Sequence, residues 1–548
     1  METLCKEGGR RLLGVSVTLV LIFVIFSVSQ AFQESEEEKK AAYAKSVIKG
    51  FTSGEIIELK KIPDNKFFDS LIKDQAGHEG ITEEEQRKIM MNVGVMKYVI
   101  GLLRDGQISL TEYVNLRPDI HWVEALRMAY VGGGLELSPS LLELLSGKVT
   151  EGVKKLRAGK DIIVREVAYS SSVEDLSPLY ADVAYNPKLK GAPVMVHVHG
   201  DIPGTRMGSI SGVHYYAQKG FFGIAPSQRG RDNSAGECDV FGREIYDIYD
   251  AVEYAKKHYG EYLDPTNINI TGGSAGGMAS ISAVVHFPDY FRMSIPYYGS
   301  ADTGDWLRQE GMFGKTHEEW LEEKRKQGWP EGSLALFNHI IRGIGGMPDE
   351  VPDKLMTRNK VLGAMNCPYT EVHMIWDQQD GVAPSITKRN HAFQEKAREM
   401  GLTNVHIHYS ERGDPIRYLH WITPDNTTAQ RFFIPKILAG TVPPPVLADA
   451  GRMVVLGFLK TKRFLVWLGE GDDAVARLDY QMSPRHYEFR FRRLSNDKVK
   501  TGKVIIPNSN KDLWDIKINH QTVKKNVNEP EIEVQFGLDD VVVITKTS

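Results

Sequence analysis

The sequence predicts an α/β fold, in which a mostly parallel sheet carries helices on both faces, with a helical region before it and a β-sandwich after it. Between residues 161 and 440, short apolar runs alternate with helical segments, as in parallel sheets covered on both faces. Helical patterns dominate before residue 160. After residue 446 the helical signal ends, and short strand candidates follow one another between turn-forming residues.

The composition is that of a globular protein of ordinary charge. The chain has 548 residues, of which 42% are hydrophobic and 25% charged, so it has room for two or three domains. A net charge of −4 gives no electrostatic reason to expect a nucleic-acid partner. The spacing of the three cysteines does not indicate a metal site. We therefore expect neither a metal nor a cofactor, and the sequence gives no indication of the oligomeric state.

The N-terminus has the pattern of a secretory signal peptide. Lys6, Arg10 and Arg11 precede an uncharged apolar run over residues 12–28, which ends in Ser29-Gln-Ala31. The pattern predicts a signal peptide over residues 1–31 and a secreted or extracytoplasmic protein. An uncleaved membrane anchor is the competing interpretation, because the run is almost long enough to span a bilayer. Residues 32–160 are expected to form a helical N-terminal region.

A catalytic α/β domain is predicted over residues 161–440. Its expected strands are 162–168, 179–184, 193–198, 222–226, 268–271, 293–296, 372–375 and 405–409. Helical segments separate most of them. Ligands of such sheets bind beyond the carboxyl ends of the strands, so residues that follow a strand are the first candidates for a functional site.

Ser274 follows one of these strands within the sequence Gly272-Gly-Ser-Ala-Gly-Gly277. A serine on a tight turn between strand and helix, with glycines at −2 and +2, is typical of a nucleophile elbow. The turn crowds the backbone, so only small residues fit beside the serine. Ser274 is therefore the expected nucleophile, and a plain glycine-rich loop is the alternative.

A serine nucleophile needs a histidine base and an orienting carboxylate, each on a loop after a later strand. Asp377 and Asp380 both follow the strand at 372–375, and His420 lies in the loop after the strand at 405–409. His406 and His408 share one face of a strand, which favours a structural role. His391 lies within a helix and is expected to point away from the site.

An oxyanion site needs two backbone donors. Ala275, the residue after the serine, offers one N–H. The loop His199-Gly200-Asp201, after the strand at 193–198, is expected to offer the other, from Asp201. Gly200 would let this backbone approach the substrate, and His199 is expected to orient the loop rather than to act as a base.

A long insert at about residues 301–366 interrupts the alternation and is rich in aromatic residues. Inserts at the ligand-binding rim can form lids, so Trp306 and Phe313 are candidates for contact with the substrate. Packing of the insert onto the core explains the same aromatics equally well. After Pro443-Pro-Pro445, a stiff linker, residues 446–548 are expected to form the β-sandwich.

The order of these motifs resembles the prolyl oligopeptidase family of α/β-hydrolases. The resemblance covers about residues 161–440 and includes His199-Gly200, Arg229-Gly230, the Ser274 elbow and His286-Phe-Pro-Asp-Tyr-Phe291. It implies the α/β-hydrolase fold, with Ser274 as nucleophile, His420 as base and Asp380 as the acid. Asp380 is favoured over Asp377 because the family's acid lies a few residues before a proline, here Pro384.

The flanking regions differ from that family. The helical first 160 residues cannot be the β-propeller of full-length prolyl oligopeptidases. A β-sandwich after the hydrolase domain is similar to the X-prolyl dipeptidyl peptidase and cocaine-esterase group, although Ala275 replaces that group's tyrosine. The expected activity is hydrolysis of a peptide through an acyl-enzyme, with a carboxylesterase as the alternative. A non-catalytic binding protein on the same scaffold is the second alternative.

Overall fold

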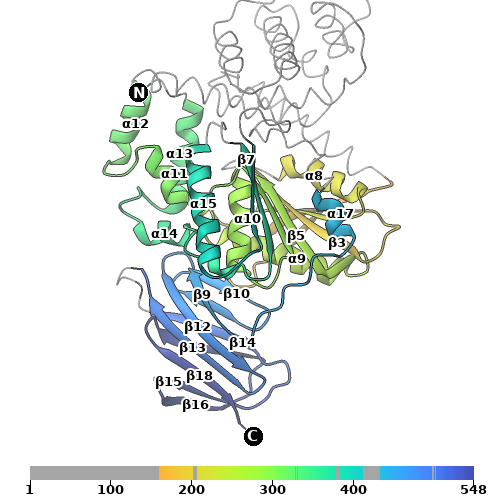
Figure 1. Cartoon of the computed structure of the whole chain (residues 1–548), viewed down its shortest axis with the longest axis vertical. Coiled ribbons are helices and arrows are strands. Elements are labelled where there is room, and N and C mark those ends of the chain that lie inside the picture. Colours follow the sequence, from red (N-terminus) through yellow and green to blue (C-terminus); the bar gives the residue numbers. More distant parts are fainter. Residues whose placement is uncertain are drawn as a thin grey trace, which may run out of the picture.

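The computed structural model describes residues 160–200, 206–327, 329, 331–377, 383–410, 432–495, 499 and 501–547. The expected signal peptide, and all of the expected helical N-terminal region except Lys160, lie outside this part of the chain. The described residues form an α/β layer structure joined to an antiparallel β structure (Figure 1).

The first unit is built on an eight-stranded sheet with the order β1-β2-β4-β3-β5-β6-β7-β8. Its strands are β1 (Ile163–Tyr169), β2 (Leu179–Tyr185), β3 (Ala192–Val198), β4 (Phe222–Ser227), β5 (Leu263–Gly273), β6 (Met293–Tyr297), β7 (Glu371–Asp377) and β8 (Val405–Ser410). β2 pairs antiparallel with β1 and with β4, and every other pairing is parallel. The predicted α/β-hydrolase fold is confirmed, and all eight predicted strands are present within a few residues.

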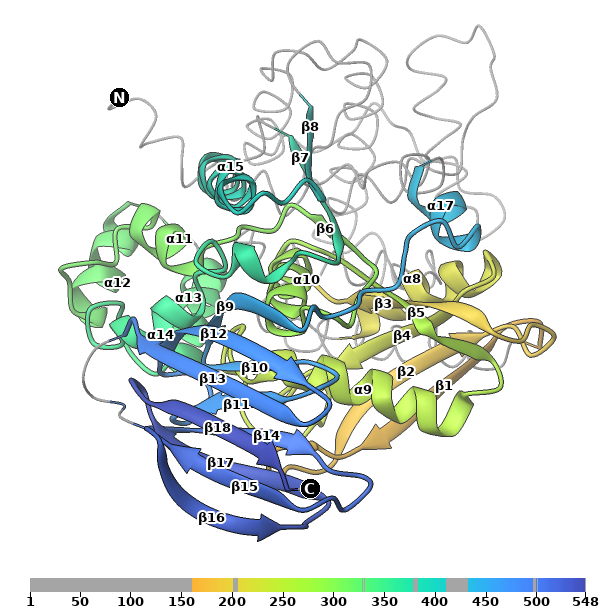
Figure 2. The ribbon, with the colours of Figure 1, turned by 60° about the horizontal axis from the view of Figure 1, so that its bottom comes forward.

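Helices cover both faces of this sheet because its central strands are apolar on both sides. The helices outside the insert are α8 (Met207–Gln218), α9 (Glu244–Tyr259), α10 (Ala275–His286), α15 (Ala383–Glu399) and α17 (Ile434–Leu438). Figure 2 shows α8 behind the sheet and α9 in front of it. α10 is buried along its whole length, between the sheet and the β structure that follows.

The insert between β6 and β7 is helical. It contains α11 (Thr303–Gln309), α12 (His317–Lys326), α13 (Glu331–Ile344), α14 (Pro352–Thr357) and the 3₁₀ turn η3 (Ala364–Asn366). α12 begins with a capping box, in which Thr316 accepts a hydrogen bond from the Glu319 N–H and the Glu319 carboxylate accepts one from the Thr316 N–H. This reciprocal pair of hydrogen bonds fixes the first turn of the helix.

The C-terminal unit is a ten-stranded antiparallel β structure with the order β16-β15-β18-β13-β12-β9-β10-β11-β14-β17. Its strands are β9 (Ala450–Leu456), β10 (Phe458–Lys460), β11 (Leu465–Leu468), β12 (Val475–Ser483), β13 (His486–Arg493), β14 (Thr501–Pro507), β15 (Trp514–Ile518), β16 (Gln521–Val527), β17 (Glu531–Gly537) and β18 (Val541–Lys546). Inward-facing side chains from both halves of this order share one core, so the predicted β-sandwich is confirmed (Figure 2).

The two units pack tightly against each other. Phe458 and Trp467 of the β-sandwich belong to the core of the hydrolase unit and stack on each other with ring centroids 5.5 Å apart. His286, at the end of α10, places Nε2 3.0 Å from the Leu456 carbonyl oxygen. The two cysteines in this part of the chain, Cys238 and Cys367, are buried free thiols rather than a disulfide.

Candidate active site

Ser274 lies at the sharp turn between β5 and α10. Its backbone has φ 55° and ψ −120°, a combination that costs a non-glycine residue about 1–3 kcal/mol. The turn is held on both sides: the Ser274 N–H donates to the Tyr297 carbonyl at 2.8 Å, and the Ser274 carbonyl accepts from the Met278 N–H at 3.0 Å. The side chain is half-buried at the carboxyl edge of the sheet. This is the conformation that the elbow motif predicts for a nucleophile.

Two glycines allow the turn to close. A Cβ on Gly272 would lie 2.6 Å from the backbone of Gly276 and 2.7 Å from the Val198 carbonyl oxygen. A Cβ on Gly276 would lie 2.3 Å from that same oxygen. Contacts this short do not occur between real atoms, so the strand, the turn and the start of α10 can approach each other only when both positions are glycine.

The loop after β3 lies against the elbow, as expected for an oxyanion loop. A Cβ on Gly200 would lie 3.0 Å from the Gly273 carbonyl oxygen and 3.8 Å from the Cβ of Ser274. Ala275, on the other side, is the first residue of α10, where backbone N–H groups have no acceptor within the helix. The helix dipole favours negative charge at that end. Asp201, the expected second donor, lies outside the described residues.

His199 is placed to hold this loop. Its Nδ1 lies 3.1 Å from the Gly200 carbonyl oxygen, and its Nε2 lies 3.5 Å from Nη1 of Arg231. Because arginine can only donate, Nε2 must carry the lone pair and Nδ1 the proton. Burial and the neighbouring Arg231 lower the pKa of His199 to about 3. His199 is therefore neutral near pH 7, which agrees with the predicted orienting role.

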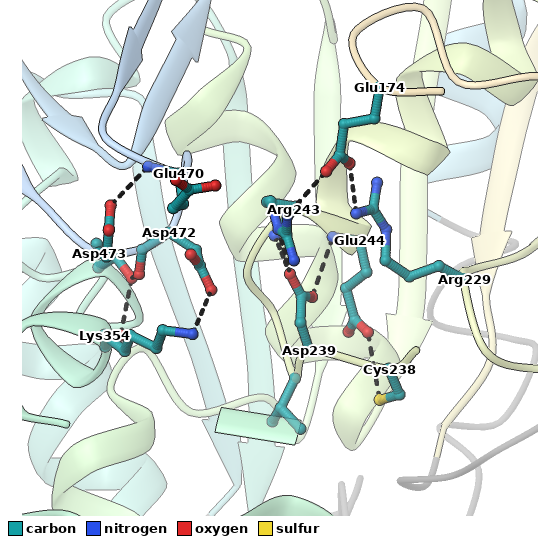
Figure 3. A network of polar contacts seen from close by, with 12 residues as sticks. Glu174, Arg229, Cys238, Asp239, Arg243, Glu244, Lys354, Glu470, Asp472 and Asp473 are labelled. Carbon is teal, nitrogen blue, oxygen red and sulfur yellow. Dashed lines mark hydrogen bonds and ion pairs between the residues drawn. The ribbon is translucent and has the colours of Figure 1, made fainter. Parts of the chain in front are cut away.

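Arg231 is itself fixed by a buried network. Its guanidinium donates to the side-chain oxygen of Gln228 at 2.7 Å and forms an ion pair of 3.2 Å with Glu244. Burial alone would raise the pKa of Glu244, but Arg231 and the Phe241 N–H bring it below its ordinary value. Figure 3 shows Glu244 beside Cys238, whose Sγ lies 3.4 Å from the carboxylate. Sequence reasoning did not find this support, because no spacing rule distinguishes Arg231 from other arginines.

The expected acid and base follow β7 and β8, which lie two and three strands from β5. Asp377 and Ser410, the last residues of these two strands, are partners in the parallel register, so both loops leave the sheet at the same edge as Ser274. Asp380 comes three residues after β7, and His420 ten residues after β8. Both lie outside the described residues, and their roles remain predictions.

The other histidines considered as candidates make structural contacts. His406 and His408 lie beside His373, which stacks on His406 with ring centroids 4.8 Å apart. His391 packs edge-on against Trp376 at 5.9 Å between ring centroids. These contacts agree with the structural roles expected for His406 and His408. For His391 the sequence predicts only that it points away from the site.

Trp306 and Phe313 are half-buried in the insert. Trp306 packs against Phe337 with ring centroids 5.4 Å apart, next to Trp320 and Trp329. Phe313 lies under the guanidinium of Arg308, 4.0 Å from the ring centroid. Both residues thus help to pack the insert. Their contact with a substrate remains a prediction.

Within the described ranges, no group of His, Cys, Asp and Glu side chains is arranged to hold a metal ion. In the same part of the chain, no helix combines the length and the apolar character needed to cross a membrane.

A known family model matches the stretch of chain that contains the elbow. Residues 209–335, which include Ser274, match the model of the prolyl oligopeptidase family. The resemblance inferred from the motifs is thereby confirmed for this stretch.

Three solved structures have similar folds. Acylaminoacyl peptidase from Pyrococcus horikoshii is 18% identical with a TM-score of 0.38, and the match covers 52% of this chain and 43% of that chain. An esterase from Pyrococcus furiosus is 14% identical with a TM-score of 0.39, over 53% of this chain and 94% of that chain. Acetyl xylan esterase from Paenibacillus sp. R4 is 16% identical with a TM-score of 0.34, and the match covers 51% of this chain and 85% of that chain. This chain thus spans less than half the length of the acylaminoacyl peptidase.

Proposed function

We propose that the protein is an exported serine hydrolase that cleaves peptide bonds through an acyl-enzyme intermediate. The observation that carries this proposal is the strained backbone of Ser274 at the end of β5, with the Gly200 loop on one side and the N-terminus of α10 on the other. A strained serine beside two sources of backbone N–H groups is an arrangement for nucleophilic attack on a carbonyl carbon.

The proposed reaction has two halves. Ser274 Oγ attacks the substrate carbonyl while His420 takes the hydroxyl proton and Asp380 orients the histidine. The N–H groups of Ala275 and Asp201 stabilise the oxyanion. His420 then gives its proton to the leaving group, which departs and leaves an ester on Ser274. Water, deprotonated by His420, attacks this ester and releases the second product and the free serine.

The charge distribution around the elbow supports the electrostatic part of this reaction. Developing negative charge lies at the N-terminus of α10, where the helix dipole is favourable. His199 contributes a neutral ring that holds the Gly200 carbonyl. Arg231 is neutralised by Glu244, so it fixes His199 without placing an unbalanced charge beneath the site.

Carboxylesterase activity on the same residues is the alternative. In amide hydrolysis the amine leaves only after His420 has protonated its nitrogen. In ester hydrolysis the alkoxide leaves more readily, so proton donation by His420 matters less. Trp306 and Phe313 are the residues that we propose to contact the substrate. Their aromatic rings suit an apolar side chain or an acyl group.

A substrate panel tests this function. Purified protein is assayed against proline-containing peptide amides and against acyl and acetyl esters with matched chromophores, and Ser274→Ala serves as the control. The proposal predicts turnover of amides, abolished by Ser274→Ala. Turnover of esters alone would establish the alternative, and turnover that persists in Ser274→Ala would remove Ser274 from the mechanism.

Export has a separate test. Expression of the full chain with a C-terminal tag, followed by N-terminal sequencing of the extracytoplasmic product, is expected to give a mature protein that begins near residue 32. A product that retains residues 1–31 in the membrane fraction would establish the anchor instead.

A further inference from the structure

A cleft of about 530 Å³ lies between the hydrolase unit and the β-sandwich, away from Ser274. One wall comes from residues 172–174, between β1 and β2, and from the first half of α9, and the other from β10, β11 and β14 and the start of β17. No residue of the elbow or of the Gly200 loop lines it. The volume lies within the range of small-molecule sites, which often occur between domains.

The β-sandwich side of the cleft carries two opposite charges that form no ion pair with each other within the described residues. Lys460 and Glu531 both line the cleft. Glu531 is the largest charge that favours the protonated lysine, whereas burial lowers the pKa of Lys460. Nevertheless, within the described part of the chain, no ion pair of 4.0 Å or less joins Lys460 to Glu531. The neighbouring Lys503 pairs with Glu533 instead. Lys460 and Glu531 therefore do not pair directly, and a ligand group that both donates and accepts could contact them.

The α9 side adds further polar groups. Asp250 accepts two hydrogen bonds from Ser172, from its N–H at 2.9 Å and its hydroxyl at 2.6 Å. Glu253 also lines the cleft, and its Oε1 accepts hydrogen bonds from Lys256 and Tyr290. The half-buried Tyr249 stacks on Phe287 and also lines the cleft. Trp467, stacked on Phe458, forms part of an apolar floor.

This mixture of groups selects the chemistry of the ligand. Carboxylates from both walls oppose a free anion, and the ammonium groups of Lys460 and Lys503 oppose a free cation. A hydroxyl group both donates and accepts, so it can bind a carboxylate and an ammonium at the same time. Several adjacent hydroxyls on an apolar ring fit a polar cleft with an aromatic floor. We propose that this cleft is a second ligand site, which binds a neutral saccharide.

Titration calorimetry on the full chain carrying Ser274→Ala tests this proposal without turnover. The probes are cellobiose, xylobiose, maltose and chitobiose, with glycylglycine as a zwitterion. At least one saccharide is expected to bind with one-to-one stoichiometry. Lys460→Met and Glu531→Gln are each expected to weaken that binding tenfold or more. Lys524→Met, an exposed lysine on β16, is the matched control and should leave binding unchanged.

A third cleft variant tests whether binding can be lost while the protein stays folded. Val173→Trp adds bulk from the partly exposed β1–β2 connection and should block the cleft while the melting temperature stays within a few degrees of the parent. Failure of all four saccharides to bind, or binding that all three cleft variants leave unchanged, would overturn the proposal. Binding of glycylglycine alone, sensitive to Lys460→Met, would also overturn it, because the site would then be one for zwitterions.

Discussion

Arg231 places Nη1 3.5 Å from Nε2 of His199, and this contact determines which nitrogen of the histidine carries the proton. The other nitrogen, Nδ1, then donates to the Gly200 carbonyl. In a trans peptide the C=O and the following N–H point in opposite directions. By holding the Gly200 carbonyl, His199 therefore orients the peptide whose N–H belongs to Asp201, the proposed oxyanion donor.

Replacement of His199 is predicted to lower kcat more than it changes KM. His199→Phe keeps the ring volume but cannot hold the Gly200 carbonyl, so an oxyanion donor loses its orientation. Loss of one such donor lowers kcat by about 100-fold or more, and a misplaced donor should give about 10- to 100-fold. Steady-state kinetics measure this, with Arg490→Met on the exposed face of β13 as control. The positioning role would be contradicted if activity fell only because less of the variant is folded, with the kcat of the folded molecules unchanged.

Arg231→Met is predicted to destabilise the fold by about 3–5 kcal/mol, because it leaves the buried Glu244 carboxylate without its partner. Arg231→Met/Glu244→Gln should recover much of this loss, since the uncompensated charge is gone. Urea unfolding measures both variants. Both variants should also have a lower kcat than the parent in steady-state assays, because His199 lacks its arginine partner in each. Full recovery of kcat in the double variant would separate Arg231 from catalysis.

Alanine substitutions at neighbouring glycines of the elbow are predicted to lower the free energy of unfolding by very different amounts. Gly272→Ala and Gly276→Ala place a Cβ against backbone atoms, and overpacking of this kind costs about 1–3 kcal/mol or more. Gly273→Ala is the matched control, because its Cβ would meet only Cδ2 of Tyr298, at 3.9 Å. Urea unfolding should show a change within about 0.5 kcal/mol for Gly273→Ala. Similar costs for all three variants would refute the packing described for the turn.

Arg358 is predicted to be a main link between the hydrolase unit and the β-sandwich. It is fully buried, and its guanidinium donates to the carbonyl oxygens of Asp239 at 2.6 Å and Asp472 at 3.0 Å. Arg358→Met should cost about 3–5 kcal/mol. The Arg358 guanidinium also forms a buried ion pair of 3.3 Å with the Asp472 carboxylate. Lys354 pairs with that carboxylate at 3.5 Å, as Figure 3 shows, but it is partly exposed. Lys354→Met should therefore cost about 1 kcal/mol or less in urea unfolding. Equal costs would contradict the difference in burial.

The pH dependence of stability is predicted to reflect Asp250. Burial raises its pKa from the ordinary 3.8 to about 6, against the lowering effect of the two hydrogen bonds from Ser172. The folded state therefore binds this proton more tightly than the unfolded state does. Its stabilising contribution is present below pH 3.8 and is lost as the pH rises through about 6.

Asp250→Asn does not titrate and provides the reference. The stability of the parent minus that of Asp250→Asn should fall between pH 4 and pH 7, by at most about 3 kcal/mol. Urea unfolding at intervals of half a pH unit measures this difference. A difference that rises with pH would show that the hydrogen bonds of Ser172 outweigh the burial of the carboxylate.

The elbow could be predicted from the sequence because its chemistry is local. A β-branched strand, two glycines at fixed spacing and a helical pattern lie within a dozen residues, and the structure places Ser274 in the strained turn that this order requires. The central strands of the sheet were predictable for a similar reason, since β2, β3, β4 and β6 are short apolar runs that are largely buried on both faces.

Other features depend on contacts that no local pattern reveals. β16 is exposed along nearly its whole length and carries no apolar alternation, so a strand there forms only because β15 pairs with it. Arg231 and Glu244 lie 13 positions apart, and only the fold brings them beneath His199. The cleft between the two units is built from five separate stretches of chain, and no one of them indicates a site by itself.

Labelling with a fluorophosphonate tests the central claim most directly. The probe forms a covalent bond only with an activated serine, and mass spectrometry of the digested protein identifies the labelled residue. The account predicts one adduct per folded chain, on Ser274, and none in Ser274→Ala. An adduct on another serine, or a folded protein that does not react, would contradict the assignment of Ser274 as the nucleophile.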